Sequence, residues 1–486
     1  MHKLCWRCRR LWLRLCLTGS LMLGILSGSA VDGAAASIPL RGIVEGFYGQ
    51  PWTQAVRLDM LQFCAGNGLN AYIYAPKDDP YHRAKWRQPY PDADCARLQE
   101  LVHAAQADGV HFIFAVSPGL DISYEGETAA RDRELLLAKL DSMYDLGVRD
   151  FAIFFDDIPA EAKDGKGAAQ AQLVNRMEEQ MRARHAGEQL LFFTVPTEYY
   201  RQDMEQDGQP RTYTREFARN LANDVVVLYT GEGVAIGNLT AAQLQAADNL
   251  YGRQLGLWWN YPVNDYATTA RALGPVEKLP AEPSLPAVFY NPMEQPQLSK
   301  IALATGAACA ADPAAYEPDK AWREALKQQY GPLAAAMGDV AQHMQHLQNS
   351  WARIGRDDAP EMKAELDEYL QLWRQQDSSL GEKLERRQLL GRRLSDELQQ
   401  LTTDCTALET GLPAETKAEL LPQLQQLRHL SRAASLAIAM SEQDSAAARV
   451  AFAQAYSEVK AHDAEAEVSK LVLRAFVDEA ADMRKR

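Results

Sequence analysis

The stretch FAIFFDDIP, which runs from Phe151 to Pro159, decides the fold class of this sequence. Five apolar residues end abruptly in two adjacent carboxylates, Asp156 and Asp157, and a proline follows shortly after. A continuous apolar run of this length is typical of a strand covered on both faces, as in a parallel sheet. The proline cannot continue such a strand. The two aspartates therefore mark the strand's C-terminal end, where they are either solvated loop residues or side chains delivered to a pocket.

Similar apolar runs recur between Ile38 and about Ala311. The other seven are Arg41–Phe47, Asn70–Pro76, His111–Pro118, Leu190–Pro196, Asp224–Thr230, Leu255–Asn260 and Pro286–Pro292. Amphipathic segments between them include Thr53–Asn67, Ala130–Leu146, Ala168–Ala186 and Thr240–Tyr251. Eight strand–helix units in about 270 residues predict an α/β fold, a (β/α)8 TIM barrel. The structural alternative is a doubly wound sheet, but no G-x-G-x-x-G motif follows a strand to favour it.

From about Pro318 the strand-like runs stop, and Glu, Gln, Lys, Arg, Leu and Ala dominate. Two sets of side chains follow a 4-3-4-3 spacing: Met362, Leu366, Tyr369 and Trp373, and Leu394, Leu398, Leu401, Cys405 and Leu408. This spacing is typical of packed antiparallel helices. We expect the barrel at residues 37–318 and an all-α bundle of about four to six helices at residues 319–486, with breaks at Pro360 and Gly411–Pro413. The bundle is expected to pack on the barrel or on a second copy of the chain, which would form a homo-oligomer through its helices; the alternative is docking of another partner.

Residues 1–36 have the order of a secretory signal. Five basic residues between Lys3 and Arg14 precede an apolar run from Leu15 to Leu26, and small residues follow. Cleavage is expected after Ala30 or Ala36, which predicts a secreted or periplasmic protein without a stable membrane span. The alternative is an uncleaved anchor, for which the apolar run is short.

Charge and composition exclude several kinds of partner and site. A net charge of −14 argues against nucleic acid and anionic membranes as partners, because both require a basic face. Outside the signal, Cys64, Cys95, Cys309 and Cys405 are widely spaced and form no C-x-x-C pair, which excludes a zinc ribbon or a disulfide-dense scaffold. They are expected to be buried small side chains, with disulfide pairing as the alternative. The nine histidines show no ligand spacing, so no metal and no cofactor are predicted.

Polar residues follow nearly every apolar run, and in a barrel such positions form the rim that carries the active site. They are Glu45–Gly49, Lys77–Asp79, Ser117, Asp156–Asp157, Thr197–Tyr200, Thr230–Gly231, Asn260–Asp265 and Asn291. Any one of them alone is typical of a loop or a helix cap. Together with the aromatic residues of WWN and FYN they suit a sugar, which has apolar ring faces and many hydroxyls.

Asp156 and Asp157 would face opposite sides of a regular strand, but at a strand end both can lean toward the rim. Two carboxylates this close repel each other, which is expected to raise the pKa of at least one of them. One would then keep its proton near neutral pH while the other stays charged, a division that is useful in acid catalysis.

Seven motifs occur in this order, nearly one at each strand end: RGIVEGFYGQPW, YIYAPKDDPYHRAKWR, FAIFFDDI, VPTEYY, LYTGEGV, WWNYPVND and YNPM. The series resembles glycoside hydrolase family 84, the retaining β-N-acetylglucosaminidases that include protein O-GlcNAcases and bacterial enzymes once called hyaluronidases. The resemblance covers Arg41 to about Trp322. Beyond Trp322, the chain is similar to the family only in having a sequence rich in predicted helices.

The resemblance implies substrate-assisted catalysis, in which the sugar's own 2-acetamido oxygen attacks the anomeric carbon and forms an oxazoline. Asp156 would then polarise the acetamido N–H, and Asp157 would be the general acid and later the base. Tyr199 would position the acetamido oxygen, with Tyr200 as the alternative. The nucleophile belongs to the substrate, so the two carboxylates need not lie on opposite sides of the ring.

The remaining site residues also follow from the resemblance. Trp258 would form the wall beside the acetamido methyl, Asn260 would contact the acetamido region, and Asp265 would bind the 4- and 6-hydroxyls. Hydroxyl recognition would be completed by Lys77, Asn291 and either Gly46 or Gly49. The implied activity is removal of terminal β-linked GlcNAc from soluble glycoconjugates. The alternatives are hydrolysis of another N-acetylhexosamine-containing polysaccharide and a catalytically inactive GlcNAc-binding barrel.

Overall fold

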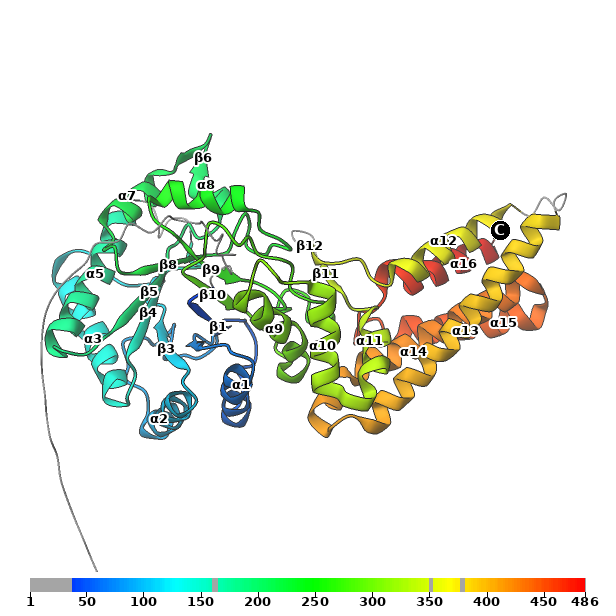
Figure 1. Cartoon of the computed structure of the whole chain (residues 1–486), viewed down its shortest axis with the longest axis horizontal. Coiled ribbons are helices and arrows are strands. Elements are labelled where there is room, and N and C mark those ends of the chain that lie inside the picture. Colours follow the sequence, from blue (N-terminus) through cyan, green and yellow to red (C-terminus); the bar gives the residue numbers. More distant parts are fainter. Residues whose placement is uncertain (1–36, 160–164, 349–352, 376–380, 486) are drawn as a thin grey trace, which may run out of the picture. The chain divides into compact units, whose positions relative to one another are not determined.

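Eight parallel strands close into a barrel, in the order β1-β10-β9-β8-β5-β4-β3-β2 (Figure 1). The computed structural model describes residues 37–159, 165–348, 353–375 and 381–485, so the predicted signal at residues 1–36 lies outside the described residues. The strands are β1 (Leu40–Glu45), β2 (Ala71–Tyr74), β3 (His111–Val116), β4 (Asp150–Phe154), β5 (Leu191–Val195), β8 (Val226–Tyr229), β9 (Gly256–Trp259) and β10 (Ala287–Tyr290). Each overlaps one of the eight apolar runs, and the predicted TIM barrel is confirmed.

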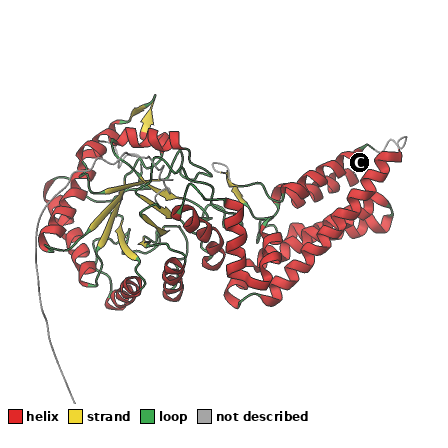
Figure 2. Ribbon diagram, in the orientation of Figure 1, coloured by secondary structure: helices red, strands yellow, loops and turns green. Residues whose placement is uncertain are grey.

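Helices surround the barrel (Figure 2). Those that follow a barrel strand are α1 (Gln54–Gly66), α2 (Asp92–Ala107), α3 (Gly126–Asp145), α5 (Gly167–Arg184), α7 (Thr212–Asn220), α8 (Ala241–Tyr251) and α9 (Pro296–Ala311). The short elements α6 (Arg201–Met204), β6 (Glu205–Gln206) and β7 (Gln209–Pro210) lie between β5 and α7. One expected helix is absent from the fully described segment 260–286, between β9 and β10. The prolines of this segment lack the N–H that a helix interior requires.

Both faces of each barrel strand are buried. Val44 and Phe154 point into the barrel interior and belong to a cluster of interior side chains. Their neighbours Ile43 and Ile153 belong to the second, larger cluster, which includes the surrounding helices. This two-sided burial explains why the runs are continuously apolar rather than alternating.

Helices dominate the chain after the barrel. They are α10 (Pro318–Tyr330), a 3-10 turn (Gly331–Leu333), α11 (Ala334–Ala341), α12 (Pro360–Arg374), α13 (Gly381–Gly411), α14 (Ala414–Glu442), α15 (Ala446–Ala461), a π-helical turn (Lys470–Arg474) and α16 (Ala475–Lys485). The predicted breaks at Pro360 and Gly411–Pro413 coincide with helix ends. Every residue of the two predicted seams is buried apart from Met362, which is partly buried.

A short antiparallel hairpin interrupts the helical part, which was expected to be all-α. Its strands are β11 (His346–Gln348) and β12 (Arg353–Gly355), and the paired Leu347 and Ile354 are buried. Strands of three residues are too short to produce a recognisable alternating pattern in a helix-rich sequence.

The helical part packs on the barrel through polar contacts. The carboxylate of Glu419, on α14, accepts hydrogen bonds from the backbone N–H groups of Gln297 (3.2 Å) and Leu298 (2.9 Å) at the start of α9. The side chain of Gln423, one turn further along α14, donates to the carbonyl of Thr269 (3.0 Å). These contacts agree with the expected packing on the barrel, while the division between domains near residue 318 and the homo-oligomer stay predictions.

The four described cysteines are free, and all but Cys95 are buried, as predicted for small buried side chains. Within the described ranges, no helix combines the length and hydropathy that crossing a membrane requires.

Candidate active site

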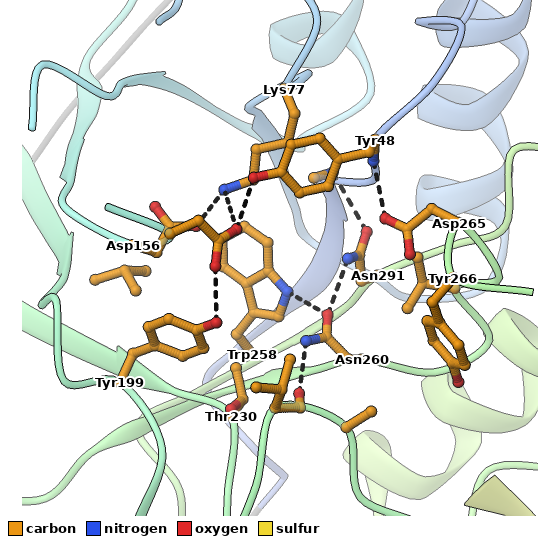
Figure 3. Close-up of a pocket in the computed structure, with 16 residues that line it drawn as sticks. Tyr48, Lys77, Asp156, Tyr199, Thr230, Trp258, Asn260, Asp265, Tyr266 and Asn291 are labelled. Atoms are coloured by element: carbon orange, nitrogen blue, oxygen red, sulfur yellow. Dashed lines mark hydrogen bonds and ion pairs between the residues drawn. The ribbon is translucent and has the colours of Figure 1, made fainter. Parts of the chain in front are cut away.

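A pocket of about 400 Å³ lies at the C-terminal ends of the barrel strands (Figure 3). It is lined by Gly46, Tyr48, Lys77, Asp156, Asp157, Val195, Tyr199, Thr230, Val234, Ala235, Trp258, Asn260, Val263, Asp265, Tyr266 and Asn291. The barrel therefore brings together nine of the ten predicted site residues, from loops that are far apart in the sequence. Gly49 is the exception.

The end of β4 allows both adjacent aspartates to line the pocket. The strand stops at Phe154, and Asp157 has a left-handed backbone with φ of 53°. This conformation is uncommon for a residue with a Cβ and is found mostly where function requires a particular side-chain direction. Asp156 is 7% exposed, whereas the side chain of Asp157 is 33% exposed. The two carboxylates thus share one pocket but differ in their access to water.

Lys77 supplies the positive charge between the two aspartates. Its buried ammonium forms an ion pair with Asp156 Oδ2, and its Nζ lies 3.7 Å from Asp157 Oδ2. Burial lowers the pKa of Lys77, but the two carboxylates outweigh burial and the net pKa is raised. Lys77 is therefore an ammonium at neutral pH.

The surroundings of Asp157 favour its ionised form. Burial raises the pKa of Asp157, but the charge of Lys77 and hydrogen bonds from Tyr199 and Tyr48 outweigh burial, so that its pKa lies below the ordinary value. The Tyr199 hydroxyl donates to Oδ1 (2.8 Å) and the Tyr48 hydroxyl donates to Oδ2 (2.8 Å). The expectation of a raised pKa for at least one of the pair considered only the two carboxylates and not the donors around Asp157.

Tyr48 and Arg83 are site residues that were not singled out from the sequence. Tyr48 is 41% exposed, and its backbone N–H donates to Asp265 Oδ2 (2.9 Å). Arg83 donates from Nη1 to the Tyr48 hydroxyl oxygen (2.7 Å) and from Nη2 to the Asp157 carbonyl (2.8 Å). Both residues lie inside quoted motifs, EGFYGQPW and YHRAKWR, which was the available signal.

Gly46 and Gly49 have different positions. A Cβ on Gly46 would lie 2.3 Å from Trp258 Cζ2, so only glycine lets the β1 loop approach the indole that forms the pocket wall. Gly49, with φ of 111°, lies outside the lining, and its N–H donates to Asp78 Oδ2 (2.7 Å). Of the two glycines considered, Gly46 is the one placed to contact a ligand.

An amide network holds Asn260 and Asn291 at the pocket wall. Asn260 Oδ1 accepts from Trp258 Nε1 (2.8 Å) and from Asn291 Nδ2 (2.9 Å), and Asn291 Oδ1 accepts from the Gly46 N–H (3.3 Å). Asn260 Nδ2 donates to the Val234 carbonyl (2.7 Å). Because each NH2 group has two protons, each asparagine keeps one further N–H for a ligand.

Tyr199 and Tyr200, which the sequence left as alternatives, occupy different positions relative to the pocket. Tyr199 lines the pocket, whereas Tyr200 is outside the lining and packs edge-on against Tyr199, with ring centroids 5.4 Å apart. Burial raises the pKa of Tyr199, and Asp157 raises it further, so Tyr199 keeps its proton and acts as a donor. Asp265, at the opposite side of the pocket, also has a pKa raised by burial.

Two residues that were predicted to lie at the rim, Asp79 and Ser117, are outside the pocket lining and contact neighbouring side chains instead. Asp79 accepts hydrogen bonds from the hydroxyls of Tyr74 (2.8 Å) and Tyr90 (2.9 Å). The Ser117 hydroxyl lies 3.2 Å from His82 Nε2, and burial lowers the pKa of His82 to about 4. That imidazole is therefore neutral at pH 7. Across the described part of the chain, no group of three or more His, Cys, Asp or Glu side chains is arranged to hold a metal ion.

Comparison with known proteins adds independent evidence on the family. Residues 41–349 match the family model described as beta-N-acetylglucosaminidase, and residues 361–477 match the model described as hyaluronidase post-catalytic domain-like. The barrel is similar to the protein O-GlcNAcases of Rattus norvegicus (31% identical over 291 residues, 58% of this chain) and Mus musculus (32% over 288 residues, 57% of this chain). The matched region spans about a third of these relatives, 31% of each.

Solved structures are similar over nearly all of the chain. CpGH84B has a TM-score of 0.81 at 32% identity and covers 91% of this chain and 77% of its own. An O-GlcNAc hydrolase mutant of Thermobaculum terrenum has a TM-score of 0.79 at 26% identity and covers 91% of this chain and 94% of its own. The barrel, its acidic rim pocket and these matches define a glycoside hydrolase. The chain belongs to glycoside hydrolase family 84, the family of the beta-N-acetylglucosaminidase model.

Proposed function

We propose that the chain is a retaining exo-β-N-acetylglucosaminidase that removes terminal β-linked GlcNAc from soluble glycoconjugates through an oxazoline intermediate. The observation that carries the proposal is the environment of Asp156. Its Oδ2 pairs with Lys77, while its buried Oδ1 has no hydrogen-bond partner among the described residues. A buried carboxylate oxygen without a donor is costly, so this atom is suited to accept a hydrogen bond from a ligand.

In the proposed first step, the acetamido N–H of the sugar donates to Asp156 Oδ1. The acetamido oxygen attacks C1, the bond from C1 to the leaving oxygen breaks, and that oxygen takes a proton from Asp157. Asp156 stays ionised and stabilises the positive charge that develops on the acetamido nitrogen. The ammonium of Lys77 forms an ion pair with Asp156 before the sugar arrives.

In the second step, water attacks C1 of the oxazoline and gives its proton to the Asp157 carboxylate. The bond between C1 and the acetamido oxygen breaks, and GlcNAc leaves with its original β configuration. Because the sugar supplies the nucleophile, no second carboxylate is required on the opposite side of the ring. The adjacency of Asp156 and Asp157, which would not suit a two-carboxylate mechanism, suits this one.

The remaining lining residues support recognition of the sugar. The Trp258 indole, held by its hydrogen bond to Asn260, offers an apolar wall for the acetamido methyl. The Tyr199 hydroxyl, which donates to Asp157 Oδ1, lines the pocket near the proposed position of the acetamido group. Gly46, Lys77, Asp265 and Asn291 offer a backbone group, an ammonium, a carboxylate and an amide to the hydroxyls, and Asn260 offers a second amide to the acetamido region.

The first test compares an aryl β-GlcNAc with its N-trifluoroacetyl analogue. Fluorine makes the acyl oxygen less nucleophilic, so we expect the rate to fall steeply on the analogue.

A second test uses the Asp157→Ala variant. This substitution should lower the rate on substrates with poor leaving groups by about 10² to 10⁴. It should have a much smaller effect when the leaving group needs no proton. Asp108→Ala, an exposed position at the end of α2, is the matched control.

Equal rates on the two N-acyl substrates would reject substrate assistance while leaving a glycosidase. No turnover in the presence of measurable GlcNAc binding would reject the enzyme and favour the sugar-binding alternative.

A further inference from the structure

Both carboxylate oxygens of Asp157 are occupied by tyrosine hydroxyls. Tyr199 donates to Oδ1 and Tyr48 donates to Oδ2, each at 2.8 Å. The proposed mechanism requires Asp157 to hold a proton and to reach the leaving oxygen of the substrate. A neutral carboxyl is a weaker acceptor than a carboxylate, and the leaving oxygen needs access to the protonated oxygen, so we expect one of the two tyrosines to move aside before the first chemical step.

Arg83 fixes the direction of the hydrogen bond from Tyr48. A guanidinium has only donors, so Arg83 Nη1 donates to the Tyr48 hydroxyl oxygen, and the single hydroxyl proton is directed at Asp157 Oδ2. The second guanidinium nitrogen, Nη2, holds the carbonyl of Asp157 (2.8 Å). If Asp157 were protonated on Oδ2, the hydroxyl of Tyr48 would keep only a weaker, neutral acceptor at that oxygen. The arrangement therefore favours the ionised form of Asp157.

Tyr48 is better placed to move than Tyr199. Tyr48 is 41% exposed and precedes Gly49, whose φ of 111° marks a loop conformation outside regular structure. Tyr199 is partly buried, and its ring packs edge-on against Tyr200. Figure 3 shows Tyr48 and Tyr199 on opposite sides of Asp156. Because Tyr48 is the more exposed of the two tyrosines, the Oδ2 side of Asp157 is where a leaving group can arrive from solvent.

We propose that Tyr48 and Arg83 are positioning residues that hold Asp157 as a carboxylate in the empty site, and that the leaving-group oxygen of the substrate displaces the Tyr48 hydroxyl from Oδ2. Asp157 then takes up one proton from solvent and delivers it to the leaving oxygen, which leaves Asp157 a carboxylate. This carboxylate accepts one proton from the attacking water and releases it to solvent, and the Tyr48 hydroxyl returns to Oδ2. This role rests on the proposed function, and it couples the acid and base forms of Asp157 to the presence of the leaving group.

Several charged or titratable groups face Asp157 and contribute to its titration. They are Tyr48, Lys77, Arg83, Asp156, Tyr199 and Asp265. Any test must therefore remove the Tyr48 hydroxyl while leaving the other groups in place, which Tyr48→Phe does.

The first measurement needs no substrate. Infrared titration of the free protein, with the Asp157→Asn spectrum subtracted, follows protonation of the Asp157 carboxyl. Tyr48→Phe should raise the pH at which Asp157 titrates by about one pH unit, the size expected for one lost hydrogen bond to a charged group. Arg83→Gln should shift it in the same direction, and Arg83→Lys, which keeps the charge, should shift it less. Tyr81→Phe, on the loop of Arg83 but outside the pocket lining, should leave it unchanged.

The second measurement is the pH profile of kcat/KM on an aryl β-GlcNAc with a poor leaving group. The falling alkaline limb should move to higher pH in Tyr48→Phe and Arg83→Gln, because the acid keeps its proton longer. An unchanged titration of Asp157, together with a loss of kcat/KM that is equal at every pH, would show that Tyr48 is only part of the pocket wall. If the protein proves not to hydrolyse β-GlcNAc, the infrared titration still decides whether Tyr48 controls the proton of Asp157.

Discussion

At the scale of single residues, the shape of the sugar pocket depends on an absent side chain. The backbone at Gly46 approaches the Trp258 indole so closely that an added Cβ would lie 2.3 Å from Cζ2 and 2.7 Å from Cη2. Both partners are constrained, because Trp258 is buried and its Nε1 is held by Asn260. A methyl group at position 46 therefore cannot be accommodated without moving the wall of the pocket.

Gly46→Ala should consequently damage catalysis more than stability. The displaced indole would misplace the acetamido group relative to C1, and a misplacement of about 1 Å costs on the order of 100-fold in rate. We expect kcat/KM for an aryl β-GlcNAc to fall by about that factor, with a change in melting temperature of only a few degrees. Gly66→Ala, where an added Cβ meets no atom within 4 Å, is the control. Retention of activity in Gly46→Ala would show that the indole is not required where it lies.

Individual site residues were predictable where they follow a strand, and less so where the site depends on contacts between loops. Asp156 and Asp157 could be found because an apolar run ends at them. The partnership of Tyr48 with Asp157 joins positions 109 apart, and the partnership of Lys77 with Asp156 joins positions 79 apart. Such pairs exist only once the barrel closes. The donors that lower the pKa of Asp157 could consequently not be identified from the sequence.

At the scale of elements, the barrel strands were recognisable as continuous apolar runs because both faces are buried, and the helical seams were recognisable by their 4-3-4-3 spacing. The segment 260–286 has no such periodic pattern, because it is irregular and is held by scattered contacts. Tyr261 donates to the Gly274 carbonyl (2.9 Å), and Trp322 of α10 donates to the Leu273 carbonyl (2.7 Å). This segment nevertheless carries Asp265 and Tyr266 to the pocket. An irregular connection that is fixed by distant partners cannot be read from local periodicity.

The seam of α13 provides a test at the same scale. Leu398 is 1% exposed, whereas Leu389 on the same helix is 45% exposed. Leu398→Ala should lower the free energy of unfolding by about 2 to 5 kcal/mol, because it removes buried methyl groups and leaves a cavity. Leu389→Ala should change it by less than about 0.5 kcal/mol. Denaturant unfolding followed by helical circular dichroism distinguishes the two, and similar effects from both would contradict the assignment of the seam.

At the scale of the whole molecule, the barrel and the helices after it are joined by a partly buried carboxylate, that of Glu419. Burial raises the pKa of Glu419 to about 7, although the N–H groups of Leu298 and Gln297 and the charge of Arg271 oppose the shift. The N-terminus of α9, which these N–H groups form, belongs to the barrel and also presents the loop after β10. The protonation of one side chain on α14 therefore affects how firmly the two parts are held together.

This junction predicts a pH-dependent stability. The pKa of Glu419 is higher in the folded protein than the ordinary 4.5, so the folded state binds the proton more tightly. The stabilisation is complete below about pH 4.5 and is lost as the pH rises through about 7. Each pKa unit corresponds to about 1.4 kcal/mol, so the difference between 4.5 and about 7 corresponds to a loss on the order of 3.5 kcal/mol. Thermal melts between about pH 5 and pH 8 should show a melting temperature that falls with pH in the unmodified protein.

Glu419→Gln should lack this contribution, because glutamine cannot ionise. The difference in melting temperature between the unmodified protein and Glu419→Gln should therefore change with pH. Glu415→Gln, at an exposed position in the first turn of α14, should keep the pH dependence of the unmodified protein. Parallel curves for the unmodified protein and Glu419→Gln would show that Glu419 is already ionised in the fold, and that the junction depends instead on the apolar packing of α14 against α9.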